Sequence, residues 1–235
     1  MSVPIKSFRS MLHSIARRIG ALPDGVLDAG QSGDLTDLAN TAMRHAWMFF
    51  AWPDALDIRE ESVITHPTVT GARYVPRSSA SRVMRQVFKV WDKDPRQSTD
   101  TAGNVAFKSF ADGAYIYNAE LSTVWVYYRP DPPEFTDTIW VTATAYVVGD
   151  LVLFTDGHVY KCLTAHTSGI FATDLAAVKW LQVPVLACLH EPVKQGVISH
   201  YKRYQSGQPV TAKSMEELMR QWLEIEIVNL REEEN

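Results

Sequence analysis

The sequence predicts an α+β fold. Helices from both ends of the chain form a discontinuous scaffold, and an antiparallel β region and an inserted small all-β module lie between them. Apolar residues recur at helical spacing near both ends, and runs rich in Val, Tyr, Trp and Phe occupy the middle. Prolines at 130–133 and at 184 bound a second group of short strands. We therefore expect a scaffold of residues 1–135 and 184–235, and an inserted module of residues 136–183.

Composition excludes several classes of protein. Of the 235 residues, 46% are hydrophobic and 21% charged, which is enough apolar sequence for one or two compact units. The formal net charge of -4 does not provide the general basic field of a dedicated nucleic-acid-binding protein. No apolar run approaches the roughly 20 residues of a membrane span, and residues 1–22 lack the continuous apolar stretch of a signal peptide. We expect a soluble protein without a membrane partner.

The two ends of the chain carry opposite charge. Four basic residues precede the first acidic residue, Asp24: Lys6, Arg9, Arg17 and Arg18. Near the other end, Arg231 is followed by three consecutive glutamates. These charges are interpreted either as solvated helix faces or as complementary charge between neighbouring subunits.

Two helices are predicted in the first part of the chain. Residues 5–19 have apolar side chains at helical spacing, which indicates a helix facing the core or, alternatively, a membrane surface. The second helix is expected to begin at Asp34 as N-cap and to end near Trp52-Pro53, because the residue before a proline is pushed out of the α region. Its aromatic residues, among them Trp47, are interpreted as core in preference to a binding platform.

The middle of the chain has the composition of strands. A strand is expected at 62–64 and a strand or short helix at 83–90. An antiparallel meander is predicted from three later runs: 105–107, 114–118 and 123–128. The last of them meets prolines from Pro130 onward, which cannot continue a central strand. A domain boundary is therefore expected there.

Short strands and closely spaced turns characterise residues 136–183. The strongest signal is Asp156-Gly157, between the apolar runs 151–154 and 159–162, which predicts a β-hairpin. Further strands are expected at 140–141 and 180–183. These residues are predicted to form a separate small β unit.

The helical period returns after Pro184. A helix is expected over 185–201, with a disturbance at Pro192 and an end at 207–209. Ser214 is predicted to cap a last helix, with Glu217 completing a capping box. The residues predicted on its inner side are Leu218, Trp222, Ile225, Val228 and Asn229.

No catalytic constellation is visible. The sequence contains no GxSxG, HExxH, GxxxxGK or GxGxxG motif, and the seven histidines are interpreted as surface or satisfied polar residues instead of ligands. Cys162 and Cys188 form no CxxC pair, which makes a zinc site improbable and favours reduced thiols. We expect no enzymatic activity, no cofactor and no metal.

One segment contains the pattern Trp140-x5-Tyr146-x2-Gly149-Asp150-x-Val152-x7-Tyr160-Lys161-Cys162 and continues through Trp180. It resembles the small chitin-binding-like carbohydrate modules of glycoside hydrolases. Similar modules are embedded in phage virion proteins. The resemblance implies that exposed aromatic rings stack on sugar rings. The candidates for a glycan or protein contact are Trp140, Tyr146, Tyr160, His166, Phe171 and Trp180. Because Trp140, Tyr146 and Tyr160 match framework positions, structural use is favoured over sugar contact there.

The remainder resembles the head-to-tail adaptor, or connector, proteins of tailed bacteriophages. The likeness rests on the order of three pieces: the helix ending Trp47…Ala51-Trp52-Pro53-Asp54, the exit Val126-Tyr127-Tyr128-Arg129-Pro130-x-Pro132-Pro133-x-Phe135-Thr136, and paired C-terminal helices separated by Gly207-Gln208. It implies a ring, commonly of twelve copies, beneath the portal. The candidates for portal docking are Trp222, Ile225, Val228, Leu230 and Arg231.

These resemblances lead to an expected function. The chain is expected to be a structural virion protein of the neck, assembled in the host cytoplasm, whose ring joins the portal to the tail and continues the DNA channel. Its expected partners are copies of itself, the portal, a downstream neck or tail protein, and DNA that passes without sequence-specific binding. The alternatives are a carbohydrate-recognition protein that binds a surface glycan through the module, and a tail-associated cell-wall hydrolase.

Overall fold

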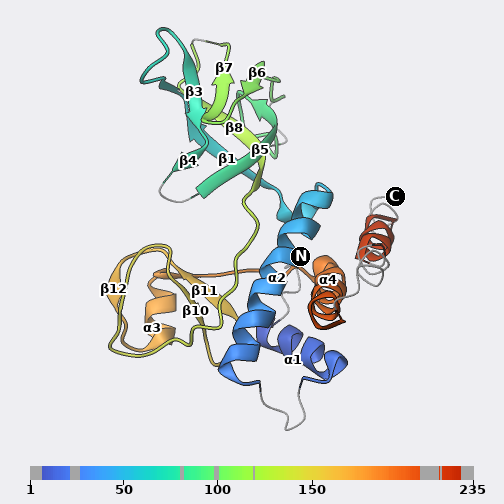
Figure 1. The fold of residues 1–235 in the computed structure, drawn as a ribbon. Coiled ribbons are helices and arrows are strands. Elements are labelled where there is room, and N and C mark those ends of the chain that lie inside the picture. The colour runs from blue at the N-terminus through green and yellow to red at the C-terminus, as the bar shows by residue number, and fades with distance from the viewer. Residues whose placement is uncertain are drawn as a thin grey trace. The chain divides into compact units, whose positions relative to one another are not determined.

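The computed structural model has the predicted α+β fold (Figure 1) and describes residues 7–21, 27–79, 82–97, 101–118, 120–206, 217 and 219–228. The chain divides into two compact units, Met1–Phe50 with Pro132–Asn235, and Ala51–Asp131. The terminal helices therefore share a unit with the β segment that follows residue 132, whereas residues 51–131 form a unit by themselves. The expected module boundaries at residues 136 and 183 stay a prediction.

The first helix, α1 (Phe8–Ile19), forms as the sequence predicts and is closed at both ends by local signals. The Ser7 side chain caps it by accepting a hydrogen bond from the backbone N–H of Ser10, at 3.3 Å. Gly20 ends it in the left-handed conformation, with φ 74°, which glycine adopts without steric cost. The apolar face of α1 is buried, so the core-facing interpretation of this helix is confirmed.

The second helix, α2 (Ala29–Phe49), begins five residues before the predicted cap at Asp34. Asp28 is the actual N-cap, because its Oδ1 accepts a hydrogen bond from the backbone N–H of Gln31 at 2.8 Å. Gly30 and Gly33 lie inside the helix, where the cap and the packing of the helix override the low helix propensity of glycine. At the other end, Trp47 is buried as expected, whereas Phe49 is 44% exposed.

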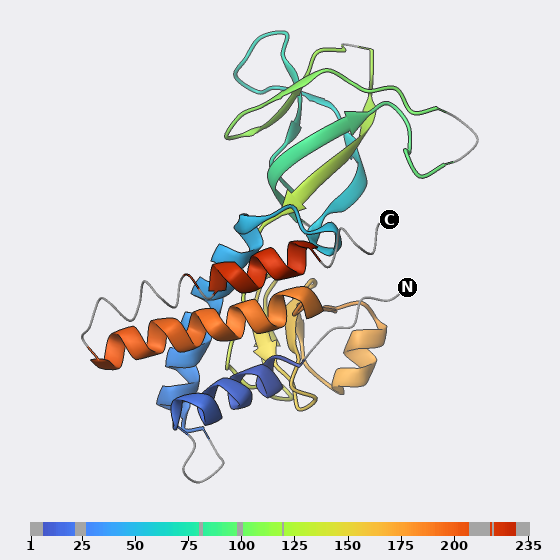
Figure 2. The ribbon, with the colours of Figure 1, turned by 90° about the vertical axis from the view of Figure 1, so that its right-hand side faces the viewer.

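The third long helix, α4 (Ala187–Ser206), contains Pro192, as the sequence predicts. It packs along α2, and Gly196 lies in the contact between the two helices. A Cβ atom at Gly196 would lie 2.8 Å from both the Ala42 Cβ and the Met219 Sδ. The missing side chain thus lets α2, α4 and the C-terminal helical residues 219–228 meet, and Figure 2 shows the last two side by side.

The C-terminal helix presents a different face to the core from the one predicted. Met219 and Leu223 are buried, whereas Trp222, Ile225 and Val228 are exposed. The prediction of an inner side through Trp222, Ile225 and Val228 was therefore wrong, because the contact of Met219 with Gly196 decides the rotation of the helix. The proposed cap Ser214, the break at 207–209, the side chain of Leu218 and Asn229 lie outside the described residues.

Residues 51–131 fold into two antiparallel four-stranded sheets, preceded by the short helix η1 (Pro53–Ala55). The first sheet has the order β1-β8-β5-β4, with β1 Asp57–Ser62, β8 Thr123–Pro130, β5 Arg82–Trp91 and β4 Ser78–Ser79. The second has the order β2-β3-β7-β6, with β2 Ile64–Thr65, β3 Arg73–Pro76, β7 Gly113–Ile116 and β6 Phe107–Ser109. Their shared core is made of Val63, Val75, Met84, Val90, Ile116, Val124, Val126 and Tyr128.

Two predictions in this unit need correction. The runs 105–107, 114–118 and 123–128 do not form a meander, because β7 pairs with β3 and β6 whereas β8 pairs with β1 and β5. Strand β8 lies between β1 and β5 and includes Pro130, which was expected to be unable to continue a central strand. Pro130 is the last residue of the strand, opposite Met84, so the missing N–H falls at the end of the ladder. The segment 83–90, predicted as a strand or short helix, is strand β5, and its two register shifts break the alternation that would have identified it.

Residues 136–183 form the predicted small β structure. Strands β10 (Leu151–Leu153), β11 (Val159–Cys162) and β13 (Trp180–Gln182) make one antiparallel sheet, and β9 (Ala145–Tyr146) pairs with β12 (His166–Thr167). The Asp156-Gly157 turn joins β10 to β11 as predicted, with Gly157 at φ 83°. The short helix α3 (Phe171–Ala176) was not predicted, and the strand expected at 140–141 is replaced by one isolated bridge between Ile139 and Leu153.

No helix among the described residues combines the length and apolar character needed to cross a bilayer.

Candidate binding module

The aromatic side chains of residues 136–183 form the interior of this segment. Trp180 is 2% exposed, and Tyr146, Tyr160 and Phe171 are also buried. The Phe171 ring stacks on Phe154 with centroids 3.7 Å apart. The edge-to-face contact of Trp180 with Tyr146 (centroids 5.1 Å) extends the cluster toward β9. An aromatic ring enclosed in this way has no free face for a sugar.

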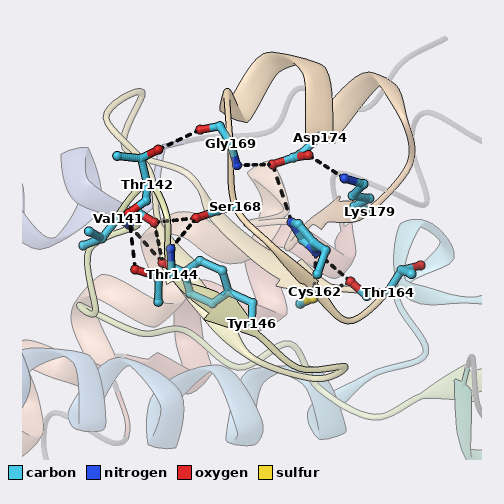
Figure 3. A network of polar contacts seen from close by, with 11 residues as sticks. Val141, Thr142, Thr144, Tyr146, Cys162, Thr164, Ser168, Gly169, Asp174 and Lys179 are labelled. Atoms are coloured by element: carbon cyan, nitrogen blue, oxygen red, sulfur yellow. Dashed lines mark hydrogen bonds and ion pairs between the residues drawn. The ribbon is translucent and has the colours of Figure 1, made fainter.

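Polar contacts around the buried Tyr146 tie the loop of residues 141–144 to β9 and to Ser168, which follows β12 (Figure 3). The Tyr146 hydroxyl accepts a hydrogen bond from the Val141 N–H at 2.9 Å and donates one to the Val141 carbonyl at 3.2 Å. The Ser168 hydroxyl also donates to the Val141 carbonyl, at 2.8 Å, and accepts from the Thr144 N–H at 3.1 Å. Tyr146 and Ser168 thus provide hydrogen-bond partners for backbone groups of Val141 and Thr144, which lie outside the regular strands.

A second set of contacts centres on Asp174, a buried carboxylate in α3 (Figure 3). It accepts hydrogen bonds from the Lys179 ammonium at 2.7 Å and from the Gly169 N–H at 3.1 Å. The hydrogen bond from Lys179, followed by that from the Gly169 N–H, lowers the pKa of Asp174. His166 Nε2 lies 3.6 Å from the same carboxylate. This set fastens α3 to the loop that precedes β13.

Cys162 lies beside His166, with 3.9 Å between its Sγ and the His166 Nδ1. The pair does not have the geometry of an activated nucleophile, because the thiol is fully buried and its burial raises the pKa of Cys162. Its Sγ instead donates to the Thr164 carbonyl at 3.2 Å. Among the described residues, no group of three His, Cys, Asp or Glu side chains could hold a metal ion.

The sequence interpretation treated the histidines as surface or satisfied polar residues and His166 as a contact candidate, and it overlooked this cluster. Cys162 and His166 are four residues apart, a spacing that was visible in the sequence. Asp174 and Lys179 carried no such signal, because α3 and the turn after it bring them to His166 only in the folded structure. The surrounding contacts indicate a structural role for all four side chains.

The surface of residues 136–183, all of which the structure describes, exposes aliphatic side chains. Its exposed large apolar residues are Ile139, Val141, Val147, Val148, Ile170, Leu175, Val178 and Leu181. No aromatic residue belongs to this exposed set within 136–183, and of the six contact candidates only Trp140 and His166 are partly exposed. The surface is therefore suited to apolar contact with another protein more than to stacking on a sugar ring.

Contacts with the helices hold this β structure at two places. The Asp156-Gly157 turn meets the start of α1, where the Arg9 N–H donates to the Gly157 carbonyl at 3.0 Å and the Ser7 hydroxyl donates to the same oxygen at 3.1 Å. Ahead of the module, the Asn40 side chain of α2 accepts from the Phe135 N–H at 2.8 Å and donates to the Phe135 carbonyl at 3.0 Å. The module is thus anchored to α1 directly and to α2 through its entry segment.

The portal-docking candidates lie partly within the described residues. Trp222, Ile225 and Val228 are exposed on the C-terminal helix, three residues apart and so on adjoining positions of one face. Leu230 and Arg231 lie outside the described residues.

Comparison with known families identifies part of the chain. Residues 139–173 match the model of carbohydrate-binding module family 5/12, which confirms the resemblance drawn from Trp140, Tyr146 and the Gly149-Asp150 pair. The match covers a small part of the chain and does not extend to α1, α2, α4 or residues 51–131. The comparison with curated proteins finds no match.

Proposed function

We propose that the chain is a structural, non-catalytic virion protein whose ring joins the portal of a phage head to the tail and continues the DNA channel. The observation that supports this proposal is the kind of apolar surface that the chain exposes. Aliphatic side chains on the module and an apolar row on the C-terminal helix suit contact with other proteins, because a partner that covers them removes apolar area from water. Copies of the chain, the portal and a downstream neck or tail protein are the proposed partners.

The apolar row on the C-terminal helix is the proposed portal contact. Met219 and Leu223 anchor the helix, which leaves Trp222, Ile225 and Val228 outward. A helix with anchored and outward apolar rows can enter a groove on a partner. These side chains are already partly buried, so a partner removes only their exposed part from water. The three together contribute to a contact that further interface residues must complete.

The aliphatic surface of the module is the proposed contact with a neighbouring neck or tail protein. Val147 and Val148, adjacent in the turn after β9, are 61% and 57% exposed. Neither side chain can donate or accept a hydrogen bond, so neither can recognise sugar hydroxyls. Their exposure supports a protein partner.

Negative-stain electron microscopy of the chain mixed with its cognate portal tests the proposal. We expect a symmetric ring on one face of the portal, and we expect Ile225→Asp to abolish it while the variant keeps its circular dichroism spectrum. Glu224→Gln, an exposed change on the same helix, serves as the matched control and is expected to leave the ring intact. A wild-type chain that stays monomeric and ignores the portal would contradict the proposal.

Carbohydrate recognition by the module is the second candidate function, and the match of residues 139–173 to carbohydrate-binding module family 5/12 favours it. A glycan array tests it directly. Trp180→Ala is a poor variant for this test, because it would empty the core of the module. Trp140→Ala is better suited, because Trp140 is partly exposed. Glycan binding that disappears in a folded Trp140→Ala chain would favour this function, whereas no binding to any glycan would leave the module structural.

A further inference from the structure

The polar face of α1 and the Asp156-Gly157 turn line an open hollow of about 610 Å³. Arg9, His13, Arg17 and Arg18 line it together with hydroxyl groups from Ser7, Ser10 and Ser14. Guanidinium and hydroxyl groups are hydrogen-bond donors that suit oxyanions. We call these lining residues of α1 the basic groove.

Two of the three arginines in the basic groove have no charged partner among the described residues. Arg18 forms an ion pair with Glu191 at 3.4 Å, whereas no described carboxylate lies within ion-pair distance of Arg9 or Arg17. Arg17 is exposed, and the Arg9 guanidinium reaches only the Thr155 carbonyl, at 3.5 Å. The groove therefore keeps unneutralised positive charge facing solvent.

The basic groove is short and is bounded by carboxylates at both ends. Asp156 lies at the end where Gly157 contacts Ser7, and Glu191 lies at the other end, beside Arg18. A helix of 12 residues is about 18 Å long. A long polyanion such as duplex DNA would run past these limits and meet both carboxylates, so the groove suits a short anionic segment.

The longest run of consecutive acidic residues in the sequence fits this description. Glu232, Glu233 and Glu234 are consecutive, and three residues in extended conformation span about 10 Å, which is shorter than the groove. Opposite charges on two surfaces of one chain can fix the register between copies of it. A heterologous contact of this kind repeats around a closed ring.

We propose that the basic groove of one copy binds the acidic run Glu232–Glu234 of a second copy, an inference that rests on the proposed ring assembly. Arg17 and Arg9 supply the charge that attracts the glutamates, and the hydroxyl groups of Ser10 and Ser14 donate hydrogen bonds to their carboxylates. Exposed ion pairs contribute little one at a time, so this contact sets the register of neighbouring copies and depends on salt concentration.

A labelled peptide of residues 229–235 tests the groove directly. The receptor is the full chain with Glu232, Glu233 and Glu234 changed to Gln, so that its own run does not compete. We expect binding that weakens as salt is raised and that falls about tenfold in Arg17→Glu, because attraction becomes repulsion. Lys161→Glu, which reverses an exposed charge on the module, is the matched control and is expected to bind as the parent does. A peptide that does not bind, or that binds equally to Arg17→Glu, overturns the proposal.

Sedimentation of the full chain at low salt identifies the source of the acidic run. We expect reversible self-association that is weakened by Arg17→Glu, weakened by changing the three glutamates to Lys, and restored when both sets of changes are combined in one chain. A chain that binds the peptide but sediments as a monomer at every concentration would place the run in its own groove and overturn the contact between copies. A duplex oligonucleotide that displaces the peptide at equal charge concentration would instead identify a nucleic-acid site.

The portal experiment separates this inference from the proposed function. An Arg17→Glu chain that still forms a ring on the portal would remove the role of the groove and leave the adaptor proposal standing. A wild-type chain that binds the peptide and self-associates but ignores the portal would support the contact between copies and remove the adaptor proposal.

Discussion

Phe8, in the first turn of α1, stacks on Phe135, which immediately precedes the module: the ring centroids are 4.5 Å apart and the planes are inclined by 16°. Both side chains are buried, and Asn40 of α2 holds the backbone of Phe135 through two hydrogen bonds. The residue at which the chain enters the module is thus fixed by two helices from the other end of the sequence. Several consequences of this anchoring can be measured.

Removing either ring should loosen the anchor. We expect Phe8→Ala and Phe135→Ala each to lower the free energy of unfolding by about 3–5 kcal/mol. In a double-mutant cycle the two changes should show a coupling of about 0.5–1.5 kcal/mol, because the stacked pair contributes beyond its buried area. Urea unfolding measures both quantities. Tyr117→Ala, at a side chain that is 65% exposed, is the control and should cost less than about 0.5 kcal/mol. Additive losses from the two phenylalanines would contradict a direct interaction.

Gly157 should be required for the contact between the module turn and α1. It has φ 83°, and a Cβ atom there would collide with the Ser7 Oγ. Gly149 has φ 101° but open space around it, so Gly149→Ala introduces backbone strain alone. We expect Gly157→Ala to destabilise more than Gly149→Ala, which should cost about 1–2 kcal/mol. Thermal unfolding compares the two, and equal losses would mean that the turn does not depend on Ser7.

Gly196 should resist replacement even by alanine. In an ordinary helix interior, alanine is about 0.5–1 kcal/mol more favourable than glycine. Here the added Cβ would lie 2.8 Å from the Ala42 Cβ, which cannot move aside as a flexible side chain can. We therefore expect Gly196→Ala to destabilise by about 1–3 kcal/mol, as overpacking does, and Ala42→Gly to restore part of the loss. A melting temperature that rises in Gly196→Ala would show that α2 and α4 separate more easily than the structure indicates.

Acid should weaken the anchoring of α3. The hydrogen bond from Lys179, and after it the one from the Gly169 N–H, lowers the pKa of Asp174. A carboxyl group whose pKa is lower in the folded state stabilises fully above its unfolded pKa, about 3.9, and loses this contribution as the pH falls through the folded value. Asp174→Asn should therefore be less stable than wild type at pH 7, and the difference should shrink below about pH 4.

Unfolding followed by tryptophan fluorescence across this pH range checks the expectation. Lys179→Gln removes the largest cause of the lowered pKa of Asp174 but keeps the Asp174 carboxylate. It should therefore reduce the loss of stability that wild type shows as the pH falls. A constant difference between wild type and Asp174→Asn at every pH would show that the carboxylate charge is not what fastens α3.

Much of the local structure could be predicted because its cause is local. The Asp156-Gly157 turn needs one residue at positive φ and carries its own glycine, and α1 has its cap, its apolar period and Gly20 within a short stretch. The start of α2 was misplaced because Asp28 and Asp34 are equally good caps in the sequence, and only the folded helix distinguishes them.

The candidate site could be predicted only in part. The segment around Trp140 and Tyr146 was identified as a carbohydrate-module-like unit, and the match over residues 139–173 agrees. Whether an aromatic ring faces solvent depends on what packs against it, and Phe154 and Phe171 cover each other inside the module. The cluster of His166 with Asp174 is also invisible in the sequence, because α3 is needed to bring the two together.

The sequence by itself determined the α+β class, the helical ends, the hairpin at Gly157 and the opposite charges of the two ends, since each depends on residues that are neighbours in the chain. Tertiary structure alone decided that Met219 and Leu223, instead of Trp222, Ile225 and Val228, face inward, and that the aromatic residues of the module are enclosed. A helix has an inner side only when a partner such as Gly196 offers space for one residue and not for another. That space is created by segments that are distant in the sequence.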